Sequence, residues 1–295
     1  MSSPSHRPFS IARIAAITAN TFIELTRQKT FYVVLLFALL LIGNSTFMAQ
    51  FTFQQEFQVL KDIALGSMSI FTSLLAIVAT AQLLPQDLAD RTVYTILAKP
   101  VARFEYLLGK LAGVLLLLAL GLIIMSALFI VVLKVREQAI LNDTLRQMEA
   151  SPPEQIAEAL GAIQTSTFNV SLFSGIAIIY VKACLLAALT LFVSTFATTT
   201  IFTTVVMAFI YFIGHLQSIA RASWLETHAA DWIAKVFLAL VALFFPDLQL
   251  FNLVDDIVAG TAIPLGLFAK TAALGCFYTG FYLLLAWSVF YRKEL

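Results

Sequence analysis

Six long apolar runs constrain this 295-residue chain more than any other feature of its sequence. Each run approaches or exceeds the roughly 17–25 residues that a helix needs to cross the hydrocarbon core of a bilayer. A backbone inside lipid must satisfy its own hydrogen bonds, so runs of this length predict spanning helices. The runs lie at 31–49, 63–84, 111–133, 170–195, 201–216 and 265–291.

The composition agrees with a membrane protein. Hydrophobic residues make up 60% of the chain and charged residues 12%, against about 25% charged residues in ordinary soluble domains. A soluble fold of this size could not cover so much apolar surface with so few charges. The net charge of +1 gives no indication of a nucleic-acid partner. We therefore expect one all-α integral membrane domain over 1–295, embedded in the lipid bilayer.

An amphipathic segment at 9–30 precedes the first run. At about 100° per residue, Arg13, Glu24 and Arg27 fall on one side of a helix, and apolar residues fall on the other. This pattern predicts an N-terminal interfacial helix that lies on the membrane surface. The alternative is that these residues are the polar start of one long spanning helix.

Basic residues indicate the orientation of the chain. Ten of the 18 lysines and arginines fall in 1–30, 85–110 and 292–295. The positive-inside rule therefore predicts that both termini are cytoplasmic, in the inner or plasma membrane of the cell. The segments 134–169 and 218–262 are then extracytoplasmic.

Two features of these outer segments predict local structure. In the first, Ser151-Pro152-Pro153-Glu154 predicts the start of a helix that runs to Leu160, with another helix before it at 137–149. In the second, the run 232–245 is short for a span and is followed by Pro246, so we predict an outer re-entrant segment. If that run spanned the membrane, the C-terminus would lie outside.

Motifs of catalytic or metal chemistry are missing from the sequence, which has no P-loop, no H-E-x-x-H and no G-x-S-x-G. We expect no catalytic residues, no metal site and no cofactor bound by this chain. Lys182 is the residue that invites a functional interpretation, since it lies about 18 Å from the turn at Ser194-Thr195, near mid-membrane. An intramembrane lysine is a functional candidate. Structural pairing and a place on a substrate pathway both remain open for it.

The loop between the second and third runs is the most informative segment. Residues 87–98 can form a short helix with Asp87 at its N-terminus, Pro100 ends that helix, and a new helix begins near Arg103. Such a helix at the cytoplasmic face would offer a rigid surface on which a soluble partner can push. The alternative is an ordinary connecting loop. The face of this helix consists of Val93, Ile96 and Leu97, beside Thr92 and Thr95.

The residues from Asp87 to Lys110 read D-x-x-D-R-T-x-Y-T-I-L-A-K-P-V-A-R-x-E-Y-L-L-G-K. In order and spacing this run resembles the coupling-helix loop in permeases of type-2 ATP-binding-cassette (ABC) transporters. Arg91 stands where many members of this family have glycine. With arginine and threonine at 91 and 92, the run resembles a branch that is grouped with multicopper-enzyme-maturation permeases. The resemblance assigns coupling to an ATPase subunit to Asp87, Asp90, Arg91, Thr92, Val93, Thr95, Ile96, Leu97, Pro100 and Arg103.

The resemblance implies a fold of six transmembrane helices with an interfacial helix, a cytoplasmic coupling helix and an outer re-entrant segment. It implies the permease subunit of an exporter, which forms a homo- or heterodimer and binds two separate ATP-binding subunits that hold the ATP and Mg²⁺. One alternative keeps this architecture but transmits force to an extracytoplasmic partner without transport, through 134–169 and 218–262. A membrane-embedded enzyme, a passive channel and a scaffold are further alternatives. The sequence does not name the cargo.

Overall fold

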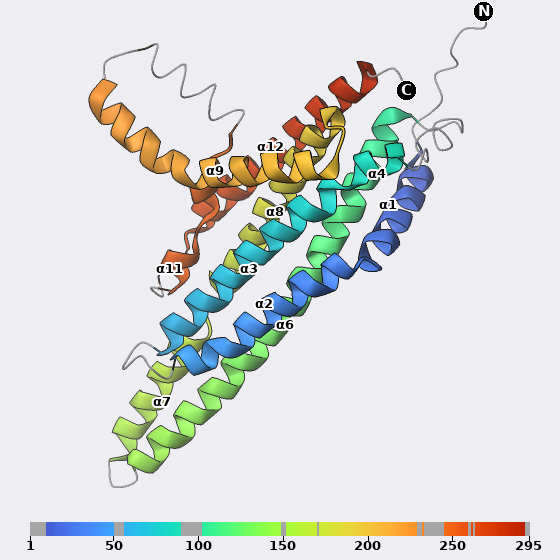
Figure 1. Cartoon of the computed structure of the whole chain (residues 1–295). Coiled ribbons are helices and arrows are strands. Elements are labelled where there is room, and N and C mark those ends of the chain that lie inside the picture. Colours follow the sequence, from blue (N-terminus) through green and yellow to red (C-terminus); the bar gives the residue numbers. More distant parts are fainter. Residues whose placement is uncertain are drawn as a thin grey trace, which may run out of the picture.

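The computed structural model describes residues 10–49, 56–89, 102–148, 152–169, 171–228, 232, 245–258, 261 and 263–292. All regular elements in these ranges are helical (Figure 1). Six helices are long and apolar enough to cross a membrane, which confirms the all-helical class and the six predicted runs. They are α2 (Lys29–Ala49), α3 (Glu56–Ala81), α6 (Arg103–Gln147), α8 (Ser171–Phe196), α9 (Thr200–His228) and α12 (Leu265–Arg292).

Helix α8 lies at the centre of the bundle and packs against α12, α3 and α6. Its inward positions are small or aliphatic, and Ala183, Leu186 and Ala187 are completely buried. Small side chains let neighbouring backbones approach closely, which is how helices gain packing energy inside a membrane. The helices α2 and α9, in contrast, expose much of their apolar surface.

The amphipathic segment forms a helix of its own, α1 (Ile11–Thr26), which the chain leaves through a turn at Arg27 and Gln28. The segment is therefore not the start of a continuous first span. Helix α1 packs along the beginning of α6 rather than standing apart from the bundle (Figure 1). Contact with a membrane surface remains a prediction.

Helix α6 is longer than the apolar run that predicted it. Residues 137–147 are helical, as expected, but they continue α6 instead of forming a separate helix. No proline or glycine interrupts the chain between Gly121 and Gln147, so nothing ends the helix where its hydrophobicity ends. Helix α7 (Pro153–Thr167) begins at the predicted proline and extends beyond the predicted end at Leu160.

The segment between α3 and α6 also differs from the prediction. A short helix, α4 (Leu83–Ala89), follows α3 directly, and Asp87 lies within it rather than at the N-terminus of a helix. Pro85 is compatible with this start because proline is tolerated in the first turn. The rest of the predicted coupling helix, at 90–98, lies outside the described residues.

The connection between α9 and α12 contains a 3₁₀ turn, η1 (Leu248–Phe251), and a short helix, α11 (Val254–Val258). Asp247 caps the 3₁₀ turn, since its carboxylate accepts a hydrogen bond from the backbone of Gln249. The predicted re-entrant run 232–245 lies outside the described residues apart from its two end positions.

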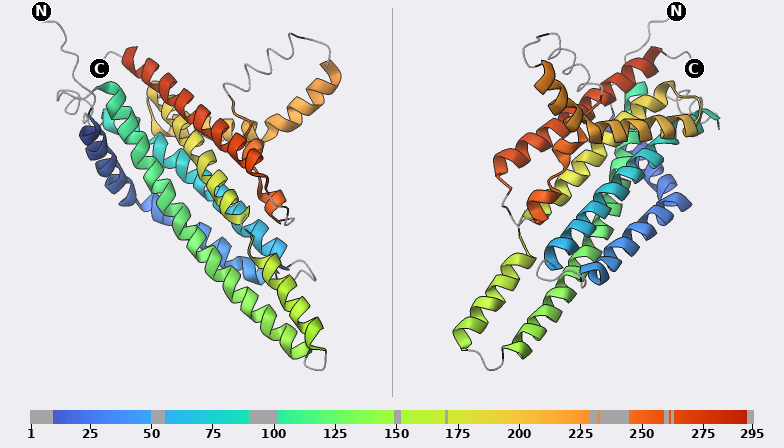
Figure 2. Two further views of the ribbon diagram at one scale, coloured as in Figure 1. Left: turned by 180° about the vertical axis from the view of Figure 1, so that it is seen from behind. Right: turned by 60° about the vertical axis from the view of Figure 1, so that its left-hand side comes forward.

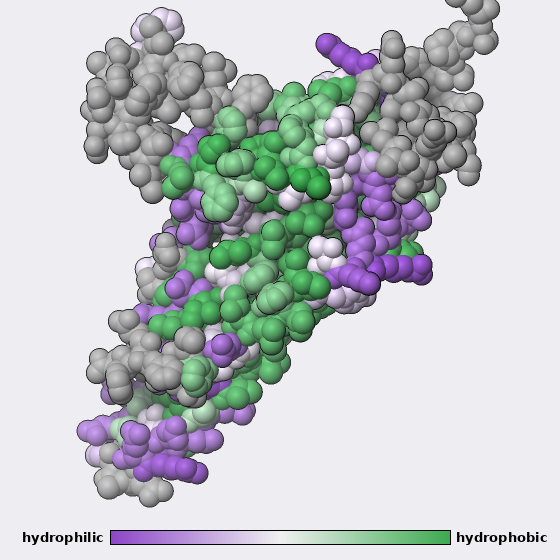
Figure 3. Space-filling view, viewed as in Figure 1, coloured by the Kyte–Doolittle hydropathy of each residue, from purple (hydrophilic) through white to green (hydrophobic). Residues whose placement is uncertain are grey.

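The beginning of α1 and the end of α12 lie at one end of the molecule, and the hairpin of α6 and α7 extends at the other (Figure 2). This arrangement fits an even number of spans. Hydrophobic residues cover the middle of the visible face, and hydrophilic residues gather at the α6–α7 end and near α1 (Figure 3). This face of the molecule therefore has the apolar middle that contact with lipid requires.

Candidate functional site

The first candidate site is the junction where α1, α4 and the start of α6 meet, which we call the α1–α4–α6 junction. Glu105, with a side chain only 1% exposed, lies where α1 and α6 both begin. Its carboxylate accepts hydrogen bonds from the backbone N–H of Ser10 at 2.8 Å and of Ala102 at 3.3 Å. Arg13 completes the arrangement with an ion pair at 3.1 Å. One carboxylate thus satisfies free N–H groups at the starts of two helices.

Two glycines allow α1 and α6 to cross closely. A Cβ atom added at Gly109 would lie 2.8 Å from Cβ of Ile17, and one at Gly113 would lie 2.6 Å from Cβ of Thr21. Thr18 also donates a hydrogen bond to the carbonyl oxygen of Gly109 at 3.2 Å. The spacing is the G-x-x-x-G pattern that packs membrane helices against one another.

A buried cluster of charges connects α1, α4 and α6. The Lys110 ammonium, 3% exposed, lies 2.6 Å from the Asp87 carboxylate and 3.6 Å from that of Glu24. The Tyr106 hydroxyl also donates a hydrogen bond to Asp87. Because the loss of one partner of a buried ion pair is strongly destabilising, such a cluster favours one relative position of its helices.

Arg103 connects the start of α6 to the end of α12. Its guanidinium donates hydrogen bonds to the carbonyl oxygens of Phe290 at 3.0 Å and Tyr291 at 2.7 Å. These carbonyls lie in the last turn of α12, where the C=O groups have no intrahelical N–H partner and a cation is favourable. Movement of the start of α6 would therefore carry the C-terminal end of α12 with it.

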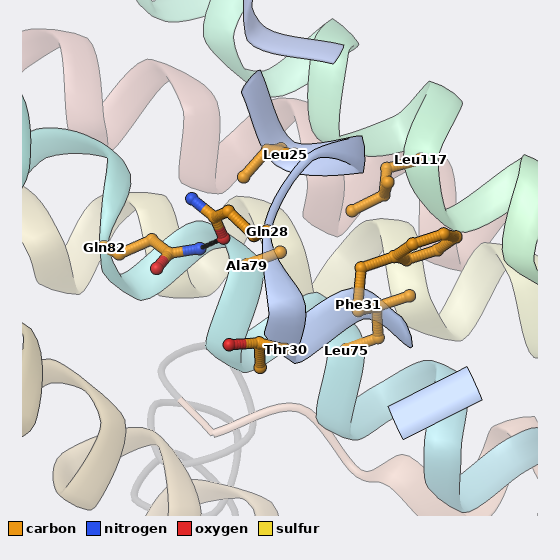
Figure 4. Close-up of a pocket in the computed structure, with 8 residues that line it drawn as sticks. All are labelled: Leu25, Gln28, Thr30, Phe31, Leu75, Ala79, Gln82 and Leu117. Carbon is orange, nitrogen blue, oxygen red and sulfur yellow. Dashed lines mark hydrogen bonds between the residues drawn. The ribbon is translucent and has the colours of Figure 1, made fainter. Parts of the chain in front are cut away.

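The turn between α1 and α2 is fastened to the end of α3. The Gln82 amide donates a hydrogen bond to the side-chain oxygen of Gln28, and the two side chains meet beside a small cavity (Figure 4). The cavity measures about 10 Å³, which is close to the least that holds one water molecule. Leu25, Phe31 and Leu117 close its apolar side.

The junction includes several predicted site residues. Asp87, Arg103, Arg13 and Glu24 all take part in its contacts, and Arg27 lies at the C-terminal cap of α1. The remaining predicted coupling residues lie outside the described residues: Asp90, Arg91, Thr92, Val93, Thr95, Ile96, Leu97 and Pro100.

The site residues predicted from the sequence did not include five residues of the junction: Glu105, Tyr106, Gly109, Lys110 and Gly113. A signal for them was present. The chain places two opposite charges and a G-x-x-x-G pattern at the entry to its most hydrophobic helix, where lipid would favour neither charge.

The second candidate site surrounds Lys182, which the structure places inside the bundle with 2% exposure. Its ammonium donates a hydrogen bond to the Ser69 hydroxyl at 2.7 Å and lies 6.0 Å from the centre of the Tyr211 ring. A cavity of about 540 Å³ adjoins it between α3, α8 and α9. Lys270, by contrast, is exposed near the start of α12.

Within the described ranges, no group of three histidine, cysteine, aspartate or glutamate side chains is placed to hold a metal ion. The helices fit a multi-pass membrane protein of the all-helical class. No family model matches the sequence, and no curated protein matches it.

Proposed function

We propose that this chain is the transmembrane permease subunit of an ABC exporter in the inner or plasma membrane, with both termini cytoplasmic. It works as a homo- or heterodimer with two separate ATP-binding subunits, which bind and hydrolyse the ATP. The proposal rests on the loop motif and on one observation about its ends. Asp87 and Lys110, the first and last residues of the motif, form a buried ion pair at 2.6 Å.

This ion pair gives the loop a mechanical role. The helices on either side of the loop 90–101 are joined at its base, because Asp87 of α4 pairs with Lys110 of α6. A push on the loop by a soluble subunit is delivered to α4 and α6 together. Glu24 and Arg13 extend the connection to α1, and Arg103 extends it to α12.

The triple variant Val93→Asp, Ile96→Asp, Leu97→Asp tests the proposal. We expect it to lose stimulation of the ATP-binding partner subunit, because three carboxylates replace the apolar face that contacts this partner. The control is Leu145→Asp, an exposed position at the far end of α6, which should leave stimulation unchanged. If the triple variant binds and stimulates the ATPase like the unaltered chain, the coupling assignment is wrong.

A second function is favoured by the length of α6. Its 45 residues extend about 67 Å at ~1.5 Å per residue, more than twice the ~30 Å of a hydrocarbon core. One unbroken helix therefore connects the junction to the α6–α7 hairpin. An ion pair of Arg136 with Glu56 braces it against the start of α3. A chain built in this way could transmit force to an extracytoplasmic partner without transport.

Removal of the hairpin separates the two functions. A variant in which a short Gly-Ser linker replaces 138–166 keeps the residues of the bundle and the junction. If the chain transports, ATP-dependent movement of substrate into inverted vesicles should continue in this variant. If it transmits force, ATPase stimulation should continue but the response of the outer partner should stop.

A further inference from the structure

The cavity beside Lys182 has mainly apolar walls, with a few polar groups among them. It lies between α3, α8 and α9, and the connection before α11 contributes Asn252 to its wall. Its volume of about 540 Å³ lies within the roughly 300–1,000 Å³ of sites that bind small molecules.

The charge at the inner end of the cavity is positive and has no counter-ion in the described structure. Lys182 has a neutral hydroxyl and an aromatic ring as its contacts. None of the ion pairs formed within the described ranges includes it. A buried ammonium is costly inside a membrane unless an anion compensates it. The inner end is therefore suited to a ligand with one negative charge.

Besides the Tyr211 phenol, two other titratable groups line the cavity. Asp62 is exposed and precedes Ser69 by seven residues, about 10 Å along α3, so it lies at the outer mouth rather than beside Lys182. The imidazole of His215 donates from Nδ1 to the carbonyl oxygen of Tyr211 at 2.9 Å. The anion-binding end of the cavity thus consists of Lys182 and Ser69, at a distance from the one carboxylate.

The rim of the cavity is apolar and exposed. Ile70 of α3 is 58% exposed and Phe212 of α9 is 64% exposed, and both line the cavity. Phe209 and Leu216 continue the exposed apolar surface along the same face of α9, one turn on either side of Phe212. An acyl chain that leaves the cavity past this rim enters apolar surroundings at once.

We propose that this cavity binds an anionic amphiphile, whose carboxylate or phosphate headgroup pairs with Lys182 and accepts a hydrogen bond from Ser69. The acyl chain leaves between Ile70 and Phe212. The inference stands apart from ATP-driven transport, because binding of this kind needs no ATP-binding subunit. The headgroup could belong to a free fatty acid or to an anionic membrane lipid, and these two sources share the same chemistry.

Binding of radiolabelled oleate to the full chain in phosphatidylcholine nanodiscs tests the proposal. We expect saturable binding that Lys182→Met weakens at least tenfold and that Lys182→Arg largely keeps. Lys270→Met is the matched control, since it removes an exposed lysine and should leave binding unchanged. Oleyl alcohol, which has the same chain and no charge, should not compete.

A second variant tests the cavity without altering the charge. Gly66 lines the cavity, and a Cβ atom there meets no other atom within 4 Å, so Gly66→Leu fills space without a clash at Cβ. We expect it to weaken oleate binding at least fivefold. Gly280→Leu, at a position with equally open surroundings on α12, should not weaken it. Equal thermal unfolding midpoints would show that each variant is folded.

Nanodiscs that contain phosphatidylglycerol distinguish the two sources of the headgroup. If phosphatidylglycerol competes with oleate, the site belongs to an anionic membrane lipid. If phosphatidylglycerol does not compete, the site belongs to a free fatty acid. Either result supports the proposal. The proposal is overturned if Lys182→Met and Gly66→Leu bind oleate as tightly as the unaltered chain, or if neither lipid composition gives saturable binding.

Discussion

Replacement of Lys110 by methionine should destabilise the α1–α4–α6 junction more than any other single charge removal within it. Methionine keeps the length of the side chain and its apolar packing, so the change removes little except the ammonium group. Lys110 is the one cation that contacts both Asp87 and Glu24 in the described structure, and it is 3% exposed. Its loss removes the ammonium that lies 2.6 Å from the buried Asp87 carboxylate, which keeps its hydrogen bond from the Tyr106 hydroxyl.

The size of the effect follows from burial. Removal of one partner from a buried pair costs about 3–5 kcal/mol, and the contact with partly exposed Glu24 contributes at most about 1 kcal/mol. We therefore expect Lys110→Met to lower the free energy of unfolding by about 3 kcal/mol, roughly 140-fold in the equilibrium constant. Asp87→Asn should cost less, because Lys110 would still have Glu24 at 3.6 Å.

Unfolding by sodium dodecyl sulfate in mixed micelles, followed by circular dichroism, measures these differences. The matched control is Lys270→Met, since Lys270 is exposed near the start of α12 and none of the ion pairs formed within the described ranges includes it. Removal of this exposed charge should change the free energy of unfolding by no more than about 0.5 kcal/mol. In the double variant of Lys110 and Asp87, the cost should be smaller than the sum of the single costs by about 1–3 kcal/mol.

Two results would refute this reasoning. An effect of Lys110→Met as small as that of the exposed control would mean that the cluster is solvated rather than buried. Strict additivity in the double variant would mean that Lys110 and Asp87 do not interact. In either case the buried ion pair would no longer support a fixed base for the loop.

Two further predictions concern helix packing and topology. Gly113→Val should push α1 away from α6, because the added Cβ would lie 2.6 Å from Cβ of Thr21. The distance between spin labels on the two helices should then lengthen by a few ångströms. The control Gly43→Val, at a position with open surroundings, should leave this distance unaltered. Glu158→Cys places a thiol at an exposed position of α7, in a chain whose Cys184 and Cys276 are both replaced. This thiol should react with a membrane-impermeant maleimide in intact cells. If it reacts only after the membrane is permeabilised, the predicted orientation is reversed.

Much of the fold could be predicted from the sequence because the relevant signals are local. The length of an apolar run and its distance from the next run decide which residues can span a bilayer. Six predicted runs are therefore helices in the structure, and the amphipathic period at 9–30 identified α1. Errors arose where hydrophobicity was used to place helix ends. Helix α6 continues to Gln147 because backbone hydrogen bonds do not stop at a lipid boundary.

The candidate sites depended on tertiary structure. Arg13 and Glu105 are separated by 92 residues, and Lys182 and Ser69 by 113. Their pairing depends on the rotation of each helix about its axis and on the neighbour that it meets, and no local pattern carries that information. The sequence by itself placed Lys110 at the cytoplasmic entry to the third apolar run and Lys182 near mid-membrane. Tertiary structure alone decided that the first has two carboxylates beside it and that the second faces a cavity, since burial and charge compensation exist only once helices pack.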